Sequence, residues 1–389
     1  MRVLHTSDWH VGKKLGQYDR LDEVAEVLAE VVEIADTQSV DLVVVSGDLF
    51  DRPSPPLDAL KLVINTLLDL TDGGKRPVVA VAGNHDSGAL FEVLAPLVET
   101  AGVHLVGEIK RPSEGGVVKV DTSAGPAAIA CFPFLREGRV VDFMADKDSW
   151  YGTYADKIRE LSQAYAEAAI AVADSDGVAL LAAHFMVTGV SLGGHGIPRG
   201  ERELHIGQAY AATEQAIPAT LHYVAMGHIH APQKVPASPV PAEYAGSLLQ
   251  LDFGEAGEEK RVVVVDVAPG QPAKITSVPL IKGRPLVRAT GTWDELVARD
   301  DLTDAYVDLV VMTDGPDPGL ADRSRKAFPY LVKVEARYDR IEAERAIRAG
   351  VPWDVLFADY VTETQGVKLP EELLEAFREV HAAAIDEDV

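Results

Sequence analysis

Short apolar runs alternate with helix-like segments over the first hundred residues of the chain. The predicted strands lie at 1–7, 41–46 and 77–82, and the predicted helices between them lie at 21–35 and 58–70. In the first of these helices apolar residues recur at three- and four-residue spacing, which produces a single apolar stripe. This alternation of strand and helix predicts an α/β sheet.

Further strand-like runs extend this fold toward residue 270. They lie at 117–120, 127–134, 178–183, 223–226 and 261–267, with another amphipathic helix at 151–173. The segment APGQPA at 268–273 then interrupts the pattern with Gly and Pro, which predicts a boundary close to residue 275.

A smaller α+β unit is predicted after this boundary. Its strands are expected at 285–290, 305–312 and 331–338, with helices at 293–298 and 319–328. Two amphipathic helices end the chain, and they either pack on their own domain or dock to a partner. We therefore expect three parts, residues 1–275, 276–338 and 339–389.

Composition limits the classes of protein to which the chain can belong. Its 389 residues include 61 acids and 36 bases, and the net charge of −25 argues against unaided binding to phosphate backbones. The acidic excess is densest after residue 290, where 23 acids stand against 11 bases. One cysteine, Cys131 in an apolar run, permits no internal disulfide and is expected to be a buried thiol. With no signal-like amino terminus and no run of 18 apolar residues, we expect a soluble, cytoplasmic protein.

Five predicted strands end in polar residues that can bind metal ions. The five segments are VLHTSDWH, LVVVSGD, VVAVAGNHD, ALLAAH and YVAMGHIH. Their candidate donors are Asp8, His10, Asp48, Asn84, His184, His228 and His230. Open α/β sheets bind ligands at the carboxyl ends of their strands, so these donors are expected to converge on one edge. Gly47, Gly83 and Gly227 precede three of the donors, and a residue without a Cβ allows a sharp turn or a close approach there.

The donor types indicate which metals and which chemistry would suit the site. Oxygen and imidazole ligands without cysteine suit manganese, iron or zinc and argue against a thiolate zinc site. Seven ligands that include one bridging carboxylate suffice for two ions about 3.5–4 Å apart, the arrangement used in phosphoester hydrolysis. His85 stands next to a donor and is available to stabilise charge or to protonate a leaving oxygen.

The motif order D-x-H, G-D, G-N-H-D, H and G-H-x-H resembles that of the calcineurin-like metallophosphoesterase superfamily. Longer segments, including TSDWHVGKKL, GDLFDRPSPP, AGNHDS, FPFLRE and YAGSLLQLDFGE, resemble the SbcD-type nucleases of bacterial SbcCD complexes over residues 1–270. The resemblance implies an α/β (α+β) fold with a β-sandwich flanked by helices, a small α+β capping domain that faces DNA, and carboxyl-terminal helices.

The resemblance also implies an activity and a set of partners. The activity is a manganese-dependent DNA nuclease, a 3′ to 5′ double-strand exonuclease and single-strand or hairpin endonuclease, in which two metal ions activate a hydroxide. It serves DNA repair, recombination and replication. The implied partners are an SbcC-type coiled-coil ATPase bound by the terminal helices, double-stranded DNA ends and hairpins, and a second copy of the chain.

The family pattern assigns roles to individual residues by resemblance. One ion would be held by Asp8, His10, Asp48 and His230, and the other by Asp48, Asn84, His184 and His228. Asp48 would bridge the two ions and His85 would be catalytic. Asp51 is a departure, because archaeal and eukaryotic relatives have a histidine there, so no DNA-positioning role is carried over to it.

Several interpretations remain open at the level of sequence. The basic residues near the motif loops, Lys13, Lys14, Arg20 and Arg52, are candidate DNA contacts, although isolated bases are often only solvated. The six histidines outside the motifs are read as structural or solvated, and only His195, in a glycine-rich loop, keeps a possible DNA-facing role. A phosphoesterase for small phosphodiesters or phosphoproteins and a metal-free scaffold for the ATPase are the competing functions.

Overall fold

The chain is described in a computed structural model that covers residues 1–135, 154–191, 211–338, 352–365 and 369–386. Contacts divide it into two compact units. The first holds Met1–Arg288 with Asp304–Asp308, and the second holds Ala289–Thr303 with Leu309–Val389. None of the helices within the described ranges is long and apolar enough to cross a lipid bilayer.

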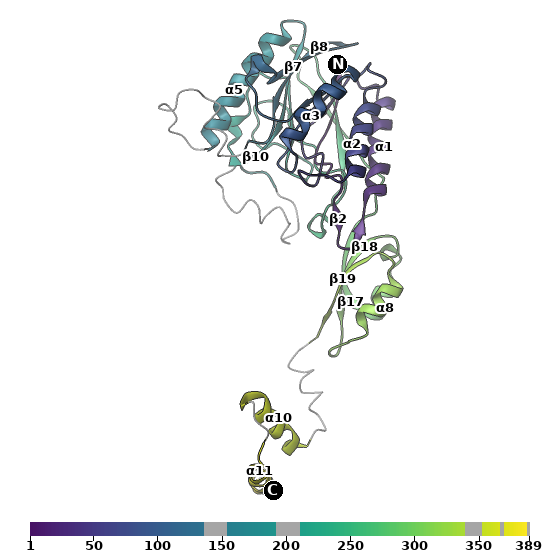
Figure 1. Cartoon of the computed structure of the whole chain (residues 1–389), viewed down its shortest axis with the longest axis vertical. Coiled ribbons are helices and arrows are strands. Elements are labelled where there is room, and N and C mark those ends of the chain that lie inside the picture. Colours follow the sequence, from purple (N-terminus) through teal and green to yellow (C-terminus); the bar gives the residue numbers. More distant parts are fainter. Residues whose placement is uncertain (136–153, 192–210, 339–351, 366–368, 387–389) are drawn as a thin grey trace. The chain divides into compact units, whose positions relative to one another are not determined.

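Two six-stranded sheets form the centre of the first unit (Figure 1). The first sheet has the order β16 (Lys274–Pro279), β15 (Arg261–Asp266), β1 (Arg2–Thr6), β4 (Leu42–Val45), β5 (Val78–Val81), β6 (Val103–Val106). The second has the order β13 (Gln233–Lys234), β14 (Ala242–Tyr244), β12 (Tyr223–Gly227), β9 (Val178–His184), β8 (Gly125–Phe132), β7 (Val117–Thr122). In the first sheet β1, β4, β5 and β6 are parallel, and β15 and β16 extend it through antiparallel pairs. In the second sheet β14, β12, β9 and β8 are parallel, and both edge strands pair antiparallel to them.

Helices cover the outer face of each sheet (Figure 1). The first sheet is covered by α1 (Leu21–Thr37), α2 (Leu57–Leu70) and α3 (Gly88–Val98), and the second by α5 (Tyr154–Ala173). Short elements complete the unit: β2 (Lys14–Leu15), β3 (Tyr18–Asp19), β10 (Met186–Val187), β11 (Ala211–Ala212), η1 (Glu99–Ala101), η2 (Pro112–Glu114), η4 (Glu214–Ala216) and η5 (Phe253–Glu255).

The alternation of side chains along each strand explains why the strands are apolar throughout. In β4, Leu42 and Val44 face the space between the sheets, whereas Val43 and Val45 face the helices. Both faces are therefore buried, as in other sheets covered on two sides. Cys131 of β8 lies in the layer between the sheets, where burial raises the pKa of its thiol to about 12, so the predicted buried thiol is confirmed.

Most of the smaller elements predicted after residue 276 belong to the second unit, although the first residues of two of its strands are counted with the first unit. A sheet of order β17 (Leu286–Thr292), β18 (Tyr306–Met312), β19 (Leu331–Arg337) is accompanied by α7 (Trp293–Val297), η6 (Asp300–Leu302) and α8 (Leu320–Ala327). The side chain of Thr292 caps α7, and the Arg323 guanidinium lies 4.6 Å from the centre of the Trp293 ring. The chain ends in α10 (Trp353–Gln365) and α11 (Glu371–Asp386), which contact each other through stacked Phe357 and Phe377 rings.

The boundary expected near residue 275 falls at the start of a strand. Residues 274–279 form β16, which pairs along its length with β15 of the first sheet. The first compact unit therefore continues to Arg288.

Candidate metal centre

The seven predicted donors come together where parallel strands of both sheets end. Asp8 and His10 follow β1, Asp48 follows β4, Asn84 follows β5, His184 ends β9, and His228 and His230 follow β12. The two sheets are joined here by a hydrogen bond of 2.8 Å from His184 Nδ1 to the Ser46 carbonyl. The donors from distant parts of the chain therefore converge, but at the adjoining ends of two sheets and not at the edge of a single sheet as expected.

One group of donors is formed by Asp8, His10 and His230. One ligand atom from each lies within 4.8 Å of the others, and all three residues are buried. The Nε2 atoms of His10 and His230 are 3.0 Å apart. Two imidazole nitrogens at this separation either share a hydrogen in an N–H···N hydrogen bond or face a common metal ion, so this group fits a metal site.

Asp48 lies between this group and the donors on the other side. Its Oδ2 atom is 3.6 Å from His10 Nε2 and 3.3 Å from His184 Nε2. The carboxylate thus faces imidazoles of both groups, which is the position required of a bridging ligand.

A second group is centred on the amide oxygen of Asn84. That oxygen lies 3.0 Å from His184 Nε2 and 2.8 Å from His228 Nδ1. Asp8, Asp48 and His184 also have ligand atoms within 4.8 Å of one another. The donor set therefore offers two adjoining positions for divalent ions, with imidazole and oxygen atoms at each.

Burial and mutual charge set the protonation of this cluster. Burial by itself raises the pKa of Asp48. The neighbouring His184 and His10 have the larger, opposite effect and bring the pKa well below its ordinary value, so the carboxylate is ionised. Burial lowers the pKa of His184, yet the Asp48 charge and hydrogen bond bring it to about 9. Burial raises the pKa of Asp8, against the opposing effect of His184 and His230. Bound dications would offset the cost of burying these carboxylates.

Four of the donors have a left-handed backbone conformation that side chains rarely adopt. The φ angles are 52° at Asp8, 45° at His10, 53° at Asp48 and 94° at His228. Such residues typically cost about 1–3 kcal/mol each and cluster at functional sites. The fold holds these residues in place although their backbone conformations are unfavourable.

The glycines that precede the donors are needed for close approach. A Cβ on Gly83 would stand 2.1 Å from Asp48 Oδ1, and a Cβ on Gly47 would stand 2.2 Å from His184 Nδ1. The close approach predicted from sequence is therefore confirmed at both positions.

His85 lies at the side of the donor cluster and is partly exposed. Its Nδ1 atom is 2.8 Å from the Asp51 carbonyl, and because a carbonyl only accepts, Nδ1 carries the proton and Nε2 is left for other contacts. Its ring centre is 4.7 Å from that of His10, and its backbone N–H donates to Asp48 Oδ1 at 2.8 Å. This position is compatible with proton transfer to a bound substrate.

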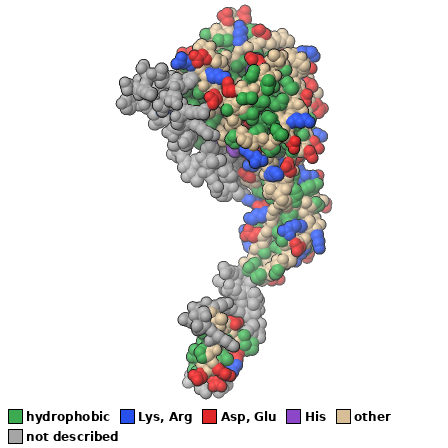
Figure 2. Space-filling model, in the orientation of Figure 1, with side chains coloured by type: hydrophobic (Ala, Val, Ile, Leu, Met, Phe, Trp, Pro, Cys, Tyr) green, Lys and Arg blue, Asp and Glu red, His purple; other side chains and the backbone are tan. Residues whose placement is uncertain are grey.

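The four predicted DNA-contacting bases differ in exposure. Lys13 lies 3.3 Å from Asp51, and its side chain is 38% exposed; that of Lys14 is 59% exposed. Arg52 is also exposed, and Figure 2 shows basic side chains next to the small histidine surface of this unit. Arg20 needs correction, because it is only 2% exposed and cannot reach DNA.

Arg20 instead has a structural place inside the first unit. Its guanidinium donates to both carboxylate oxygens of Glu23, at 2.7 and 2.9 Å, and to the Gln250 carbonyl at 2.6 Å. The same group lies 5.2 Å from the centre of the Tyr306 ring.

Histidines outside the motifs have other environments. His5 is fully buried between Tyr223 and Ser46, with hydrogen bonds of 2.8 and 2.7 Å, and burial lowers its pKa to about 3. It is structural, as expected. His195 lies outside the described residues.

Two buried acids at the centre were not predicted. Asp86 accepts hydrogen bonds from the backbone N–H groups of Leu49, Phe50 and Gly83, so it ties the loop after β4 to the loop after β5. Burial and the Asp48 charge raise its pKa to about 7. Glu255 contacts His230 Nδ1 at 3.0 Å. Both acids lie in segments that carry the family resemblance, GNHD and LDFGE. This location in the sequence is the signal that could have identified them.

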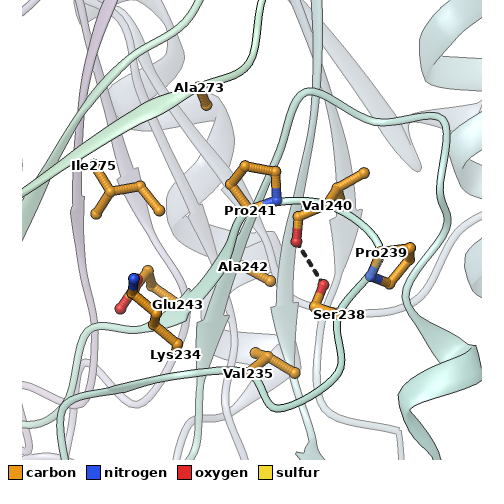
Figure 3. Close-up of a pocket in the computed structure, with 10 residues that line it drawn as sticks. All are labelled: Lys234, Val235, Ser238, Pro239, Val240, Pro241, Ala242, Glu243, Ala273 and Ile275. Atoms are coloured by element: carbon orange, nitrogen blue, oxygen red, sulfur yellow. Dashed lines mark hydrogen bonds between the residues drawn. The ribbon is translucent and has the colours of Figure 1, made fainter.

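A separate hollow of about 500 Å³ lies away from these donors (Figure 3). It is lined by the loop between β13 and β14, where Ser238 donates to the Val240 carbonyl, and by Ala273 and Ile275. None of the predicted site residues lines it, so it is distinct from the candidate metal centre.

The chain is similar to known proteins over its whole length. A family model described as calcineurin-like phosphoesterase matches residues 1–232. The SbcD subunit of the SbcCD nuclease from Bacillus subtilis (strain 168) is 33% identical and aligns with 100% of both chains. The SbcD subunits from Rhodobacter capsulatus and Escherichia coli (strain K12) are 29% and 28% identical, over 75% and 77% of this chain and 73% of theirs. These similarities confirm the family resemblance and the fold class predicted from the motifs.

Proposed function

Because the chain belongs to the calcineurin-like phosphoesterases and, within them, to the SbcD nucleases, we propose that it is the metal-dependent nuclease subunit of an SbcCD complex. It hydrolyses DNA phosphodiesters as a 3′ to 5′ exonuclease on double strands and as an endonuclease on hairpins and single strands. The observation that carries the proposal is the convergence of seven oxygen and imidazole donors where strands of the two sheets end.

The donors divide into two sets around Asp48. Asp8, His10 and His230 would hold one ion with it, and Asn84, His184 and His228 would hold the other. Manganese is the proposed metal, since hard oxygen and imidazole ligands without thiolate suit it. When bound, two divalent ions neutralise phosphate charge and increase the acidity of water.

The protein's own groups orient the substrate and move a proton. His85 carries its Nδ1 proton against the Asp51 carbonyl, so its Nε2 can face the scissile phosphate and deliver a proton to the leaving oxygen. Lys13, Lys14 and Arg52 are proposed to contact the phosphate backbone.

The terminal helices are proposed to bind the coiled-coil ATPase. Trp353 and Tyr360 of α10 are 64% and 63% exposed, and Val380 of α11 is 70% exposed. The stacked Phe357 and Phe377 rings hold the two helices together. Residues 276–338 are proposed to face DNA.

A homodimer is proposed to form through helices of the first unit. Val93 and Leu97, one helical turn apart on α3, are 65% and 70% exposed, and Leu57 at the start of α2 is 80% exposed. Figure 2 shows hydrophobic side chains gathered over this face. The proposed compartment is the cytoplasm, where the single thiol would stay reduced.

Cleavage of labelled DNA with manganese tests the activity. Blunt duplex and hairpin substrates, labelled at either end, are incubated with the protein alone and with the ATPase and ATP. Cleavage lost in Asp48→Asn supports the proposal. Hydrolysis of a small phosphodiester without DNA cleavage would favour a general phosphoesterase, and ATPase binding without any hydrolysis would favour a scaffold.

Affinity for DNA tests the charge argument. The net charge of −25 predicts that the isolated subunit binds DNA weakly and that affinity falls as salt rises. Tight, salt-insensitive binding by the isolated chain would contradict this expectation.

A further inference from the structure

A buried ion pair stands directly behind one of the candidate ligands. Glu255, which is fully buried, contacts His230 on one side and Lys260 on the other. We propose that Glu255 is a positioning residue, and this proposal rests on the metal centre proposed above. Glu255 fixes the tautomer and orientation of His230 and thereby sets the affinity of one of the two ions.

The contact to His230 determines which imidazole nitrogen can bind a metal ion. Glu255 Oε1 lies 3.0 Å from His230 Nδ1. An ionised carboxylate only accepts hydrogen bonds, so Nδ1 carries the proton. His230 Nε2 then presents its lone pair toward His10, whose Nε2 is 3.0 Å away. Metal-bound histidines commonly have such an acceptor behind them, and it keeps the ring in place.

Lys260 keeps the carboxylate ionised in a buried position. Its Nζ atom lies 2.6 Å from Glu255 Oε2 and also donates to the His230 carbonyl at 3.1 Å. An ammonium group at this distance favours the charged form of a buried carboxylate. The ammonium thus holds both the carboxylate and the backbone of the ligand.

The two oxygens of Glu255 have separate partners. Oε1 faces His230, whereas Oε2 accepts from Lys260, from Ser247 Oγ at 3.2 Å and from the Leu251 N–H at 3.2 Å. The side chain is therefore held by several contacts that do not depend on a metal ion. Its backbone is part of η5, which is capped by Asp252.

The hydrogen-bond acceptor behind His230 is a charged carboxylate, whereas the acceptor behind His184 is uncharged. His184 Nδ1 donates to the neutral carbonyl of Ser46. His10 Nδ1 is buried and has no hydrogen-bond partner in the described part of the chain. Loss of the Glu255 charge should therefore weaken the ion held with His230 more than the ion held with His184.

Glu255→Gln tests this asymmetry, because it keeps the shape of the side chain and removes its charge. Manganese binding is measured by titration calorimetry and by electron paramagnetic resonance, which distinguishes a pair of coupled ions from a single ion. We expect one site to weaken roughly 10–100-fold and the other to change by less than about threefold.

Glu243→Gln is the matched control. Glu243 is also a buried acid of the first unit, 1% exposed and paired with Arg261 at 2.7 Å, but no contact joins it to a predicted ligand in the described structure. The Glu243→Gln chain should bind both ions with the affinity of the wild type. Equal weakening of both ions in Glu255→Gln, or wild-type binding of both, would overturn the proposal.

A measurement on the wild-type chain covers the case in which Glu255→Gln fails to fold. Nitrogen-15 spectra of the zinc-loaded protein, with His230 assigned through His230→Gln, should show a proton on Nδ1 and none on Nε2. A proton on Nε2 would refute the assignment. These readouts do not involve DNA, so a chain that binds two ions but cuts no DNA would refute the nuclease function and still decide the role of Glu255.

Discussion

Gly83→Ala isolates the packing that places the proposed bridging carboxylate. The added Cβ would lie 2.1 Å from Asp48 Oδ1 and 2.4 Å from the Asp48 backbone nitrogen, whereas ordinary contact begins at 3.4 Å. The carboxylate would have to move by more than 1 Å, and its backbone offers no flexible end that can yield. The substitution therefore acts directly on the residue shared by both ions.

Two effects of Gly83→Ala have different sizes. Overpacking should lower the free energy of unfolding by about 1–3 kcal/mol. A smaller, opposite effect raises the free energy of unfolding by about 0.4–1 kcal/mol, because alanine reduces the conformational entropy of the unfolded chain. A misplacement of about 1 Å in a catalytic group can reduce turnover about 100-fold, so activity should suffer more than stability.

The assay combines urea denaturation, manganese titration and DNA cleavage on the same preparation. We expect a folded protein with both ions weakened and cleavage reduced about 100-fold. Gly319→Ala is the control, because its added Cβ would meet Asp317 at an ordinary 3.6 Å. Wild-type ion affinity and cleavage in Gly83→Ala would refute the position assigned to Asp48.

Other predictions follow from the same contacts. His85→Ala should reduce cleavage at least about 100-fold while both ions and the ATPase still bind; unchanged cleavage would remove its proposed role. Arg20→Met should lower the free energy of unfolding in urea by about 3 kcal/mol, because it leaves the Glu23 carboxylate without its charged partner, and DNA affinity should not change. Chelation of divalent ions should lower the midpoint of thermal unfolding, since an ion at 100 times its Kd contributes about 2.7 kcal/mol; a midpoint independent of manganese would argue against the site. The pKa of His5 is about 3 in the folded chain, against 6.5 for an unperturbed histidine, so its stabilising effect is present above pH 6.5 and lost as pH falls. Acidification from pH 7.5 to pH 5 should therefore lower the free energy of unfolding by roughly 2 kcal/mol through His5. A His5→Gln chain should lack that contribution in urea denaturation.

Sequence alone predicted the parts of the fold that depend on local pattern. The strands were recognisable because both faces of β4 and β5 are buried, which leaves continuous apolar runs. The donors were recognisable because each follows such a run directly. Strand β16 was missed since four of its six residues are exposed and only Ile275 and Val278 are partly buried, so that it reads as a linker until its pairing with β15 is known.

The remaining errors concern residues whose role depends on distant contacts. Arg20 has the charge of a DNA contact, but only the fold shows that Glu23 and Gln250 enclose its guanidinium. Asp86 and Glu255 appear in the sequence as two acids among 61, and their burial against backbone N–H groups and His230 is set by tertiary structure.

Residues that lie far apart along the chain meet at the candidate metal centre, and this has a consequence for synthesis of the protein. The backbone N–H of His228 donates to Asp8 at 3.0 Å across 220 residues, and the contact behind His230 comes from Glu255. A chain still on the ribosome cannot assemble the centre until these late residues have emerged, even though Asp8, Asp48 and Asn84 are already made. Ribosome-bound fragments and carboxyl-terminally truncated products that lack residue 228 should therefore be unable to cut DNA, and the cell is exposed to the nuclease only once the domain is complete.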